Sequence, residues 1–540
     1  MARSAAGSRT GTGSAATDQR RLVAALAGAL ARAHGVADVT AIETHISHVL
    51  IAGDAAYKIK KPLRMPFVDY STLARRRHFC EEELRLNRRL APGLYRDVVA
   101  ITGPVDAPQL GGDGPAIEYA VRMRAFAQDA LLSECLARGE LTASRVDELA
   151  RIVASFHAGL PGASVHSPYG SPAHALADAL DNFDAIAPVT VAERRDLVAR
   201  LRDWTLAEHG RCAAAMAQRR RDGRVRECHG DLHLRNVALV DDRVTVFDGI
   251  EFNPHLRWID VVGEAAFAAM DLADRGRDDY AWRFLNAWLE ATGDYGGVAV
   301  LRFHLVYRAM VRAKVRFLRA AQLAVPEEQA KVRADADGYL DLARRLADSF
   351  APAIVVMHGP AGCGKTTISQ RLLETLPAVR LRTDVERKRL HGYAPDALTG
   401  SAVDAGMYSA AATQRTYEHL AAQASVIVNA GYATLLDGAF LRRWQRESMR
   451  ELATRLRIPF VVVAIDVPES VLRQRVAARA QERRDASEAT LEVLERQLAE
   501  HEPLGADERL HAVRLDGTLS SDDPRHAAGL AAVAAALAPS

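Results

Sequence analysis

A glycine-rich loop between a buried strand and a helix constrains the fold of this chain more than any other sequence feature. Residues 359–366 carry the spacing Gly-x4-Gly-Lys-Thr. An apolar run at 353–357 enters the loop, and residues 366–373 leave it with helical periodicity. This arrangement directs backbone N–H groups and a helix N-terminus at bound phosphates. It predicts a nucleotide-binding P-loop made of Gly359, Gly362, Cys363, Gly364, Lys365, Thr366 and Thr367.

The segments around and after this loop favour a parallel sheet. Short apolar runs alternate with helical segments at 353–357, 379–382, 433–436, 460–465 and 511–515. Such runs are typical of strands that are buried on both faces. Residues 348–540 are therefore predicted to form a P-loop NTPase domain of the α/β class. Its boundary is placed at residues 347–352, a stretch that ends in Ala-Pro.

Polar residues at the strand ends supply candidate chemistry for the P-loop. Lys365 is expected at the β- and γ-phosphates of ATP, and Thr366 is expected to bind Mg²⁺. Asp384 ends the second strand, at the sheet edge where parallel topology places residues beside a nucleotide. Asp384 is thus the candidate base for an acceptor hydroxyl, and Arg387 is the candidate substrate-positioning residue. Asp437 is the candidate second metal ligand.

Arginines crowd the segment 473–484. Charge runs of this kind usually mark a solvated helix. Beside a P-loop they are also typical of a lid whose arginines stabilise the transferring phosphate. Arg475 and Arg479, one turn apart, are the predicted catalytic lid residues.

A second candidate site lies in the first half of the chain. Residues 229–236 read His-Gly-Asp-Leu-His-Leu-Arg-Asn, and residues 244–249 read Val-Thr-Val-Phe-Asp-Gly. This is the spacing of a kinase catalytic loop and its metal-binding aspartate. Phosphoryl transfer needs a carboxylate at the hydroxyl and oxygen ligands for Mg²⁺. We assign Asp231 as the base or hydroxyl-orienting group, and Asn236 and Asp248 as metal ligands.

A kinase site also needs a strand lysine and a helix glutamate that holds it. Lys58 and Lys60 share one face of the predicted strand 56–62. Glu83 lies near the centre of the apolar stripe of the predicted helix 71–90, where an inward carboxylate requires a partner. The pair Lys58 and Glu83 is therefore predicted at the ATP site, with Lys60 as the alternative lysine.

The composition is that of an ordinary globular chain. Its 540 residues, 49% hydrophobic and 26% charged, require more than one core. The 70 basic and 68 acidic residues leave a net charge of +2, so no overall field attracts nucleic acid or a membrane. Five cysteines without a CxxC pair argue against zinc or disulfides and favour the cytoplasm. No apolar run approaches the length of a membrane span.

The first half is predicted to be a two-lobed α+β domain at residues 20–347. Short strands and one helix characterise its small lobe, at about 38–122, and helical periodicity dominates its second lobe, at about 126–345. Residues 1–19 are rich in Ala, Gly, Ser and Thr and are expected to be a disordered tail. The segment from Arg20 resembles a twin-arginine export signal, but Arg32 and His34 favour an amphipathic helix instead.

Residues 38 to about 345 resemble the aminoglycoside phosphotransferase-type kinase fold, related to choline and fructosamine kinases, through the His-Gly-Asp-x-His-x-x-Asn loop. The sequence departs from the family where Gly249 follows Asp248. Glu251 is then either a second metal or substrate contact or a solvent-exposed carboxylate. The resemblance implies a hinge near residues 118–124, where backbone groups would meet adenine.

Residues 353 to about 520 resemble P-loop kinases such as gluconate kinase, chloramphenicol phosphotransferase and polynucleotide 5′-kinase, the last through Thr383-Asp384-x-x-Arg387. The order of both halves resembles the bacterial bifunctional aminoglycoside phosphotransferase/ATP-binding protein family. Together these features predict a kinase with two sites that use ATP and Mg²⁺ and act on hydroxyl groups of small molecules. The alternatives are an ATP-binding switch in the P-loop half, or a polynucleotide 5′-hydroxyl kinase, which the low aromatic content of 6% disfavours.

Overall fold

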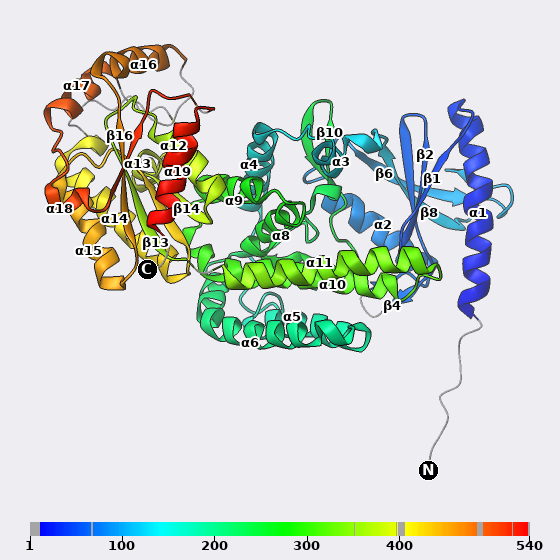
Figure 1. Ribbon diagram of the computed structural model, residues 1–540. Helices are drawn as coiled ribbons and strands as arrows, with labels where there is room; N and C mark the ends of the chain where they lie inside the picture. Colours follow the sequence, from blue (N-terminus) through cyan, green and yellow to red (C-terminus); the bar gives the residue numbers. More distant parts are fainter. Residues whose placement is uncertain are drawn as a thin grey trace. The chain divides into compact units, whose positions relative to one another are not determined.

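The computed structural model describes residues 11–65, 68–349, 351–395, 397, 406–482, 490–520 and 522–537, and for residues 11–16, 406 and 479–482 it describes the main chain alone. The chain forms two compact units. The first comprises residues 1–145, 159–170 and 222–264, and the second comprises residues 146–158, 171–221 and 265–540. Both units contain helices and strands, in agreement with the predicted α/β and α+β classes (Figure 1).

The first unit is built on an antiparallel sheet with the strand order β1-β2-β3-β8-β6-β7. The strands are β1 (Thr40–Glu43), β2 (Ser47–Ala52), β3 (Ala55–Lys60), β8 (Glu118–Arg124), β6 (Tyr95–Thr102) and β7 (Gln109–Leu110). Tyr57 and Ile59 of β3 pack with Leu26 of α1 (Gly11–His34) on one face of this sheet. Lys58 and Lys60 point to the other face, toward α2 (Leu73–Asn87). The predicted alternation along this strand is confirmed.

The remaining elements of the first unit surround the catalytic-loop motif. They are β4 (Arg64–Met65), β5 (Val68–Asp69), η1 (Gln128–Ala130), α3 (Leu132–Ala137), β9 (Val225–Glu227), η3 (Leu234–Asn236), β10 (Val237–Val240), β11 (Arg243–Val246), α7 (Pro254–Arg257) and β12 (Trp258–Asp260). β9 pairs with β12, and β10 pairs with β11 as a hairpin. Residues 229–236 therefore lie between two short strands that fix both ends of the loop.

Helix α1 corrects one prediction. It begins at Gly11, so the disordered tail predicted for residues 1–19 is wrong over residues 11–19. The physical reason is visible at Gln19, which is buried and donates its amide N–H to the Lys60 carbonyl (2.7 Å) and to Glu118 (3.1 Å). Residues 1–10 of the predicted tail lie outside the described residues.

The hinge that the resemblance implied at residues 118–124 is also corrected. These residues form β8, which pairs with β3 on one side and with β6 on the other. Its backbone groups are used by both neighbours and cannot also meet adenine. Glu118 itself is buried, and both of its carboxylate oxygens accept from Arg76 Nε at 2.9 Å.

The second unit carries the P-loop on a parallel sheet with the strand order β14-β15-β13-β16-β17. The strands are β13 (Ala353–His358), β14 (Ala378–Arg382), β15 (Ala433–Asp437), β16 (Phe460–Asp466) and β17 (Ala512–Asp516). All five predicted strands are confirmed to within two residues, and so is their parallel direction. The boundary predicted at 347–352 begins in the last two residues of α11 and ends before β13, inside the second unit, so as a domain boundary it stays a prediction.

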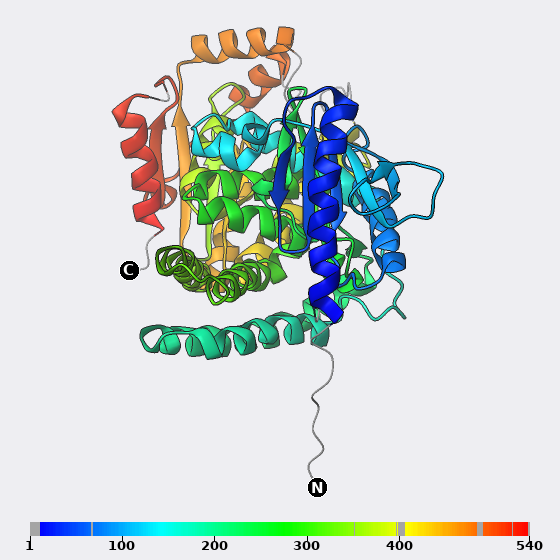
Figure 2. The same cartoon turned by 90° about the vertical axis from the view of Figure 1, so that its right-hand side faces the viewer.

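Helices surround this sheet and also make up the earlier part of the second unit. Around the sheet lie α12 (Lys365–Thr375), α13 (Thr383–Leu390), η5 (Gly406–Tyr408), α14 (Ala410–Asn429), α15 (Arg443–Leu456), α16 (Glu469–Glu482), α17 (Leu491–Ala499), α18 (Ala506–Arg509) and α19 (Pro524–Ala536). The earlier helices are α5 (Pro172–Ile186), η2 (Ala187–Val189), α6 (Ala192–Arg221), α9 (Asp278–Thr292), η4 (Tyr295–Gly297), α10 (Val298–Ala320) and α11 (Pro326–Asp348). Helices α10 and α11 lie side by side in both views (Figures 1 and 2).

Two helices, α4 (Ala143–Gly159) and α8 (Val261–Asp274), contribute residues to both units. Among the described residues, no helix has the length and apolar character that a membrane crossing requires.

Candidate functional sites

The first site is a buried cluster of lysines and carboxylates in the first unit. Lys58 Nζ lies 2.8 Å from Glu83 Oε1 and also contacts the carboxylate of Asp248. Lys60 Nζ lies 2.7 Å from the other oxygen of Glu83. The structure therefore forms both the predicted pair and its alternative, because each oxygen of one glutamate holds a different lysine.

Glu251 extends this cluster in a way that the sequence did not predict. Its side chain is buried and contacts both Lys60 and the hydroxyl of Tyr70. It is not exposed to solvent, so that interpretation of Glu251 is wrong, whereas a second metal or substrate contact stays a prediction. A buried ammonium group needs a full set of acceptors, and Lys60 obtains a second carboxylate here.

The opposite charges of Glu83 and the two lysines offset the effect of burial on their pKa values. Burial would raise the pKa of Glu83, but the ammonium groups of Lys58 and Lys60 outweigh burial and lower that pKa to about 2. Burial also opposes the charge on Lys58, yet the carboxylates of Asp248 and Glu83 raise its pKa well above the ordinary value. Glu83 and Lys58 are therefore both ionised at neutral pH.

The catalytic-loop motif brings its predicted residues together. Asn236 Nδ2 donates to the main-chain oxygen of Asp231 at 2.9 Å and to its carboxylate at 3.1 Å. His233 Nε2 lies 3.3 Å from the same carboxylate oxygen. The Asp231 carboxylate is thus oriented by two side chains of its own loop, as a hydroxyl-orienting group requires.

Glu264 supports this loop by binding its main-chain N–H groups. Its carboxylate accepts the N–H groups of His229 (2.6 Å) and Gly230 (2.7 Å). Gly230 has φ +89°, and a Cβ there would lie 2.8 Å from the Leu256 carbonyl, so only glycine fits. No role of Glu264 was predicted from the sequence, because a carboxylate that binds main-chain amides belongs to no motif of fixed spacing.

Asp248 also has a left-handed backbone, with φ +64°. Its N–H donates to the hydroxyl of Tyr95 at 3.1 Å, and the N–H of Gly249 donates to Asn87 at 2.7 Å. Its side chain is 42% exposed. These contacts hold the backbone in place while the carboxylate stays accessible to a ligand.

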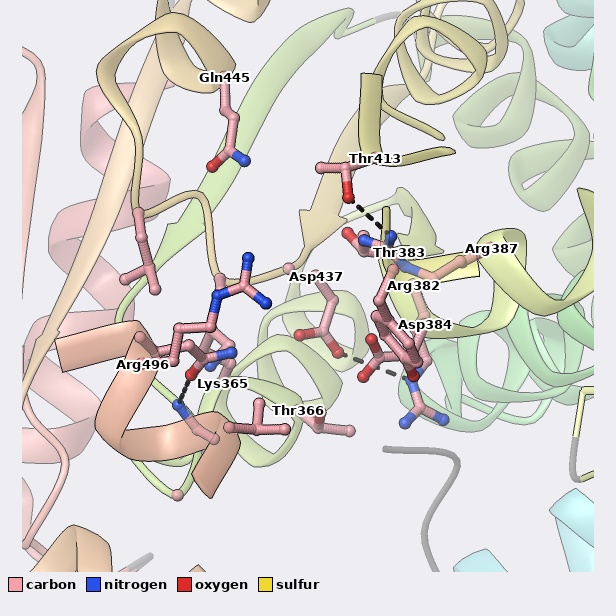
Figure 3. A pocket seen from close by; sticks show the side chains of 18 of the residues that line it. Lys365, Thr366, Arg382, Thr383, Asp384, Arg387, Thr413, Asp437, Gln445 and Arg496 are labelled. Carbon is pink, nitrogen blue, oxygen red and sulfur yellow. Dashed lines mark hydrogen bonds and ion pairs between the residues drawn. The ribbon is translucent and has the colours of Figure 1, made fainter. Parts of the chain in front are cut away.

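The second site is a cavity of about 720 Å³ around the P-loop (Figure 3). Most of the predicted residues of this domain line it, namely Gly362, Gly364, Lys365, Thr366, Thr367, Asp384, Arg387 and Asp437. Gly359 and Cys363 belong to the loop but not to the lining, and the Cys363 side chain is fully buried. The glycine conformations match the motif, since Gly362 and Gly364 have φ of +83° and +99°.

Lys365 is held by the loop itself. Its Nζ donates to the carbonyls of Gly359 and Pro360, both at 2.8 Å. Its position at the start of α12 places it where the helix N-terminus also favours an anion. The loop thus holds an ammonium group at the cavity without using a carboxylate.

Asp437 ends β15, is buried and lines the cavity. It accepts from the hydroxyl of Ser369 at 3.1 Å and lies 3.8 Å from Arg382 Nε. Asp384, at the start of α13, lines the same cavity, as does Thr366. A hydroxyl group and two carboxylates are therefore present together at the carboxyl edge of the sheet.

Arg387 is buried, in agreement with a role inside the cavity. Its guanidinium donates to the carbonyl of Met407 at 3.0 Å and to the hydroxyl of Thr413 at 3.2 Å, and it lies over the ring of Tyr408 at 5.0 Å. These contacts fix the guanidinium between α13 and α14, where it lines the cavity together with Asp384.

The arginines differ from the prediction. Arg475 does not line the cavity, and its guanidinium donates instead to the carbonyls of Gly362 (3.3 Å) and Gly517 (2.9 Å). The side chain of Arg479 lies outside the described residues. Three arginines without a predicted role line the cavity instead, namely Arg382, Arg442 and Arg496. They come from different elements, so no local cluster of arginines marked them in the sequence.

A pair of histidines lies beside the P-loop. His358, the last residue of β13, contacts the Phe440 carbonyl through Nδ1 at 3.0 Å, and its Nε2 lies 3.1 Å from His501 Nε2. Burial lowers the pKa of His358 to about 4. Since one of the two facing nitrogens must accept, at least one ring of the pair is neutral.

Comparisons with known proteins agree with the second site. A family model described as an AAA domain matches residues 354–504, which include the P-loop, Asp384 and Asp437. Uncharacterized proteins of Mycobacterium tuberculosis and Mycobacterium bovis are 28% identical over 461 residues, 84% of this chain and 90% of each relative.

Two solved structures each match part of the chain. A choline/ethanolamine kinase family protein from Mesorhizobium loti is 14% identical, with a TM-score of 0.38, over 61% of this chain and 95% of its own. A gluconokinase from Sinorhizobium meliloti 1021 is 21% identical, with a TM-score of 0.25, over 35% of this chain and 96% of its own. The matching AAA-domain model and the strand, loop and helix at residues 353–375 together identify residues 354–504 as a P-loop domain.

Proposed function

We propose that the chain is a bifunctional ATP-dependent phosphotransferase in which each unit transfers the γ-phosphoryl group of ATP to a hydroxyl of a small-molecule acceptor. One observation carries this proposal: the same set of functional groups occurs twice. A lysine, a candidate base and an acidic metal ligand occur in the first unit as Lys58, Asp231 and Asp248, and in the second unit as Lys365, Asp384 and Asp437. The resemblance to bifunctional aminoglycoside phosphotransferase/ATP-binding proteins is part of this proposal.

In the first site, Asp231 accepts the proton of the acceptor hydroxyl. The hydroxyl oxygen forms a bond to the γ-phosphorus while the bond from that phosphorus to the β,γ-bridging oxygen breaks, and ADP leaves. Lys58, held by Glu83, neutralises the phosphates. Asn236 and His233 keep the Asp231 carboxylate in one orientation, so the geometry is set before the acceptor arrives.

In the second site, Asp384 has the corresponding role toward its own acceptor. The ammonium group of Lys365 moves from the loop carbonyls to the β- and γ-phosphates, and the loop N–H groups bind phosphate oxygens. Arg387, fixed by Met407 and Thr413, positions the acceptor or the transferred phosphate. Catalysis by either site is then positioning and charge stabilisation.

The side chains present fit Mg²⁺, which prefers oxygen ligands. Asn236 and Asp248 would hold it in the first site, and the accessible Asp248 carboxylate suits this role. Thr366 and Asp437, which line one cavity, would hold it in the second site. When bound, Mg²⁺ neutralises the phosphate charge that develops during transfer.

The test uses the full-length chain and measures both binding and transfer. Calorimetric titration with ATP and MgCl₂ should give two nucleotides per chain, and Lys58→Met and Lys365→Ala should each reduce this to one. Lys61→Met is the matched control for the first site, because Lys61 follows the same strand but pairs with the exposed Glu43. A single nucleotide bound by the unaltered chain at saturation would refute the bifunctional proposal.

Transfer is tested by ATP consumption with sugars, amino alcohols, aminoglycosides and 5′-hydroxyl oligonucleotides. Asp231→Asn and Asp384→Ala should abolish different activities in this panel. Transfer to oligonucleotides that Asp384→Ala abolishes would identify the second unit as a polynucleotide 5′-kinase, an alternative favoured by the arginines that line its cavity.

The P-loop as an ATP-binding switch is a second candidate function, favoured by the contacts of α9 with the P-loop sheet inside one unit. A switch needs ATP binding but no acceptor base. If Asp384→Ala bound ATP and left every transfer activity intact, the switch would replace the second kinase site.

A further inference from the structure

Helix α9 covers the open edge of the P-loop sheet. β14 is an edge strand, so within the described part of the chain the backbone groups on its outer side have no neighbouring strand. Asn286 of α9 supplies the missing partners: its Nδ2 donates to the Ala378 carbonyl at 2.9 Å, and its Oδ1 accepts the Arg380 N–H at 2.7 Å. The buried amide of Asn286 thus replaces an adjacent strand.

Glu290 lies one turn after Asn286 and faces the same strand. Its carboxylate lies 3.1 Å from Arg382 Nη1 and 3.4 Å from Arg380 Nη2. Its main-chain carbonyl accepts from Arg389 of α13. Three arginines of the P-loop part of the second unit are therefore bound by a single residue of α9.

Arg382 connects this contact to the P-loop cavity. It lines the cavity, and its Nε lies 3.8 Å from the Asp437 carboxylate, the proposed metal ligand. The guanidinium thus lies between two carboxylates and is closer to Glu290. Its side chain is 13% exposed, so solvent screens these charges only in part.

We infer that Glu290 is a positioning residue of the P-loop site: it holds Arg382 back from Asp437 and so keeps that carboxylate available for the magnesium–nucleotide complex. The inference rests on the function proposed for the second unit. Without the charge of Glu290, Arg382 would pair directly with Asp437 and compete with the cation. The P-loop site is then completed by a residue that lies before the P-loop domain in the sequence.

The experiment measures how ATP binding to the second site depends on MgCl₂. The parent is the full-length chain with Lys58→Met, which leaves the second site as the ATP site. Adding Glu290→Gln should raise the half-saturating MgCl₂ concentration about tenfold, the size expected when a charge-assisted hydrogen bond is lost. ATP affinity in EDTA should change less than about twofold, because no cation then competes with Arg382.

Glu374→Gln is the matched control. Glu374 of α12 pairs with Arg283 of α9 at 2.7 Å, so its loss also removes an ion pair between α9 and the P-loop part, but Glu374 does not line the cavity. Glu374→Gln should leave the MgCl₂ dependence unchanged. Arg382→Gln tests the same link from the other side and should lower the MgCl₂ requirement, alone or combined with Glu290→Gln.

The outcomes separate the inference from the function on which it rests. If Glu290→Gln has the same MgCl₂ dependence as Glu374→Gln while both bind ATP, the positioning role is wrong and the function stands. A Glu290→Gln chain that does not fold leaves Arg382→Gln to decide, and an unchanged MgCl₂ requirement there also overturns the inference. If the Lys58→Met parent binds no ATP, the proposed function fails together with the inference.

Discussion

The two sites differ in how they hold their positive charge. In the first unit, Lys58 and Lys60 are buried and each contacts two carboxylates. In the second unit, Lys365 rests on the neutral carbonyls of Gly359 and Pro360 beside an open cavity. Ion pairs between buried lysines and carboxylates contribute to folding as well as to phosphate binding. A lysine that contacts only neutral carbonyls can exchange these contacts for an anion. Substitutions in the network of Lys58, Lys60 and Glu83 should therefore affect stability as well as ligand binding, whereas substitution of Lys365 should affect mainly ligand binding.

The largest effect is expected for Glu83→Gln. It removes the charge that holds both Lys58 and Lys60 in a fully buried position, and breaking a buried ion pair costs about 3–5 kcal/mol of unfolding free energy. Urea denaturation of the full-length chain measures this loss. Glu81→Gln is the control, because Glu81 pairs with Arg77 at 2.9 Å on the exposed side of the same helix. Equal losses for the two variants would show that the network does not stabilise the first unit.

An intermediate effect is expected from pH in the second unit. The pKa of His358 falls from 6.5 to about 4 on burial, so the unfolded chain binds the additional proton in this range. The contribution of neutral His358 to the free energy of unfolding is complete above pH 6.5 and is lost as the pH falls to about 4. This contribution is about 3 kcal/mol at most. Urea midpoints of the unaltered chain and of His358→Gln should therefore converge over this interval. His391→Gln, at an exposed histidine, should instead follow the unaltered chain.

The same titration sharpens the contrast between the units. The pKa of Glu83 is about 2, below its ordinary 4.5, so its stabilisation is present above pH 4.5 and is lost only as the pH falls toward 2. Acid should therefore weaken the second unit near pH 5 and affect the Glu83 network at lower pH. Hydrogen exchange that reports first-unit opening before second-unit opening on acidification would contradict this order.

The smallest effect is expected for Arg475→Ala. Arg475 supports the P-loop through the carbonyls of Gly362 and Gly517, so its loss should loosen the loop and weaken ATP binding about threefold. Calorimetry in the Lys58→Met background measures this change. Arg473→Ala, which removes an exposed arginine from the same helix, is the control. A loss of turnover beyond about a hundredfold, with ATP binding intact, would return Arg475 to the catalytic lid role that the sequence predicted.

The fold was predictable wherever the pattern was local. Alternation placed Lys58 and Lys60 on one face of β3, and apolar runs gave all five parallel strands. The start of α1 was not predictable, because its first residues are small and polar and Gln19 is fixed by distant partners. The hinge implied near residues 118–124 was misplaced because the resemblance carried no information on which strand lies inside the sheet.

The candidate sites were predictable where residues recur at fixed spacing. The P-loop, the loop with Asp231 and Asn236, and the pairing of Glu83 with a lysine all follow from spacing and burial. Glu251 could not be assigned, since its partner Lys60 lies far away in the sequence. The arginines of the cavity were missed for the same reason: tertiary structure gathers them from β14, α17 and the residue before α15.

The amide of Asn286 has a practical consequence for anyone who divides this chain. A fragment that begins near residue 348 would leave the outer side of β14 bare, with Ala378 and Arg380 offering their peptide groups to any extended segment. Exposed edges of this kind join copies of a protein to one another. Such a fragment would be prone to aggregate or to exchange strands. If it showed no activity in an assay, lost solubility would explain the result without any dependence of one reaction on the other.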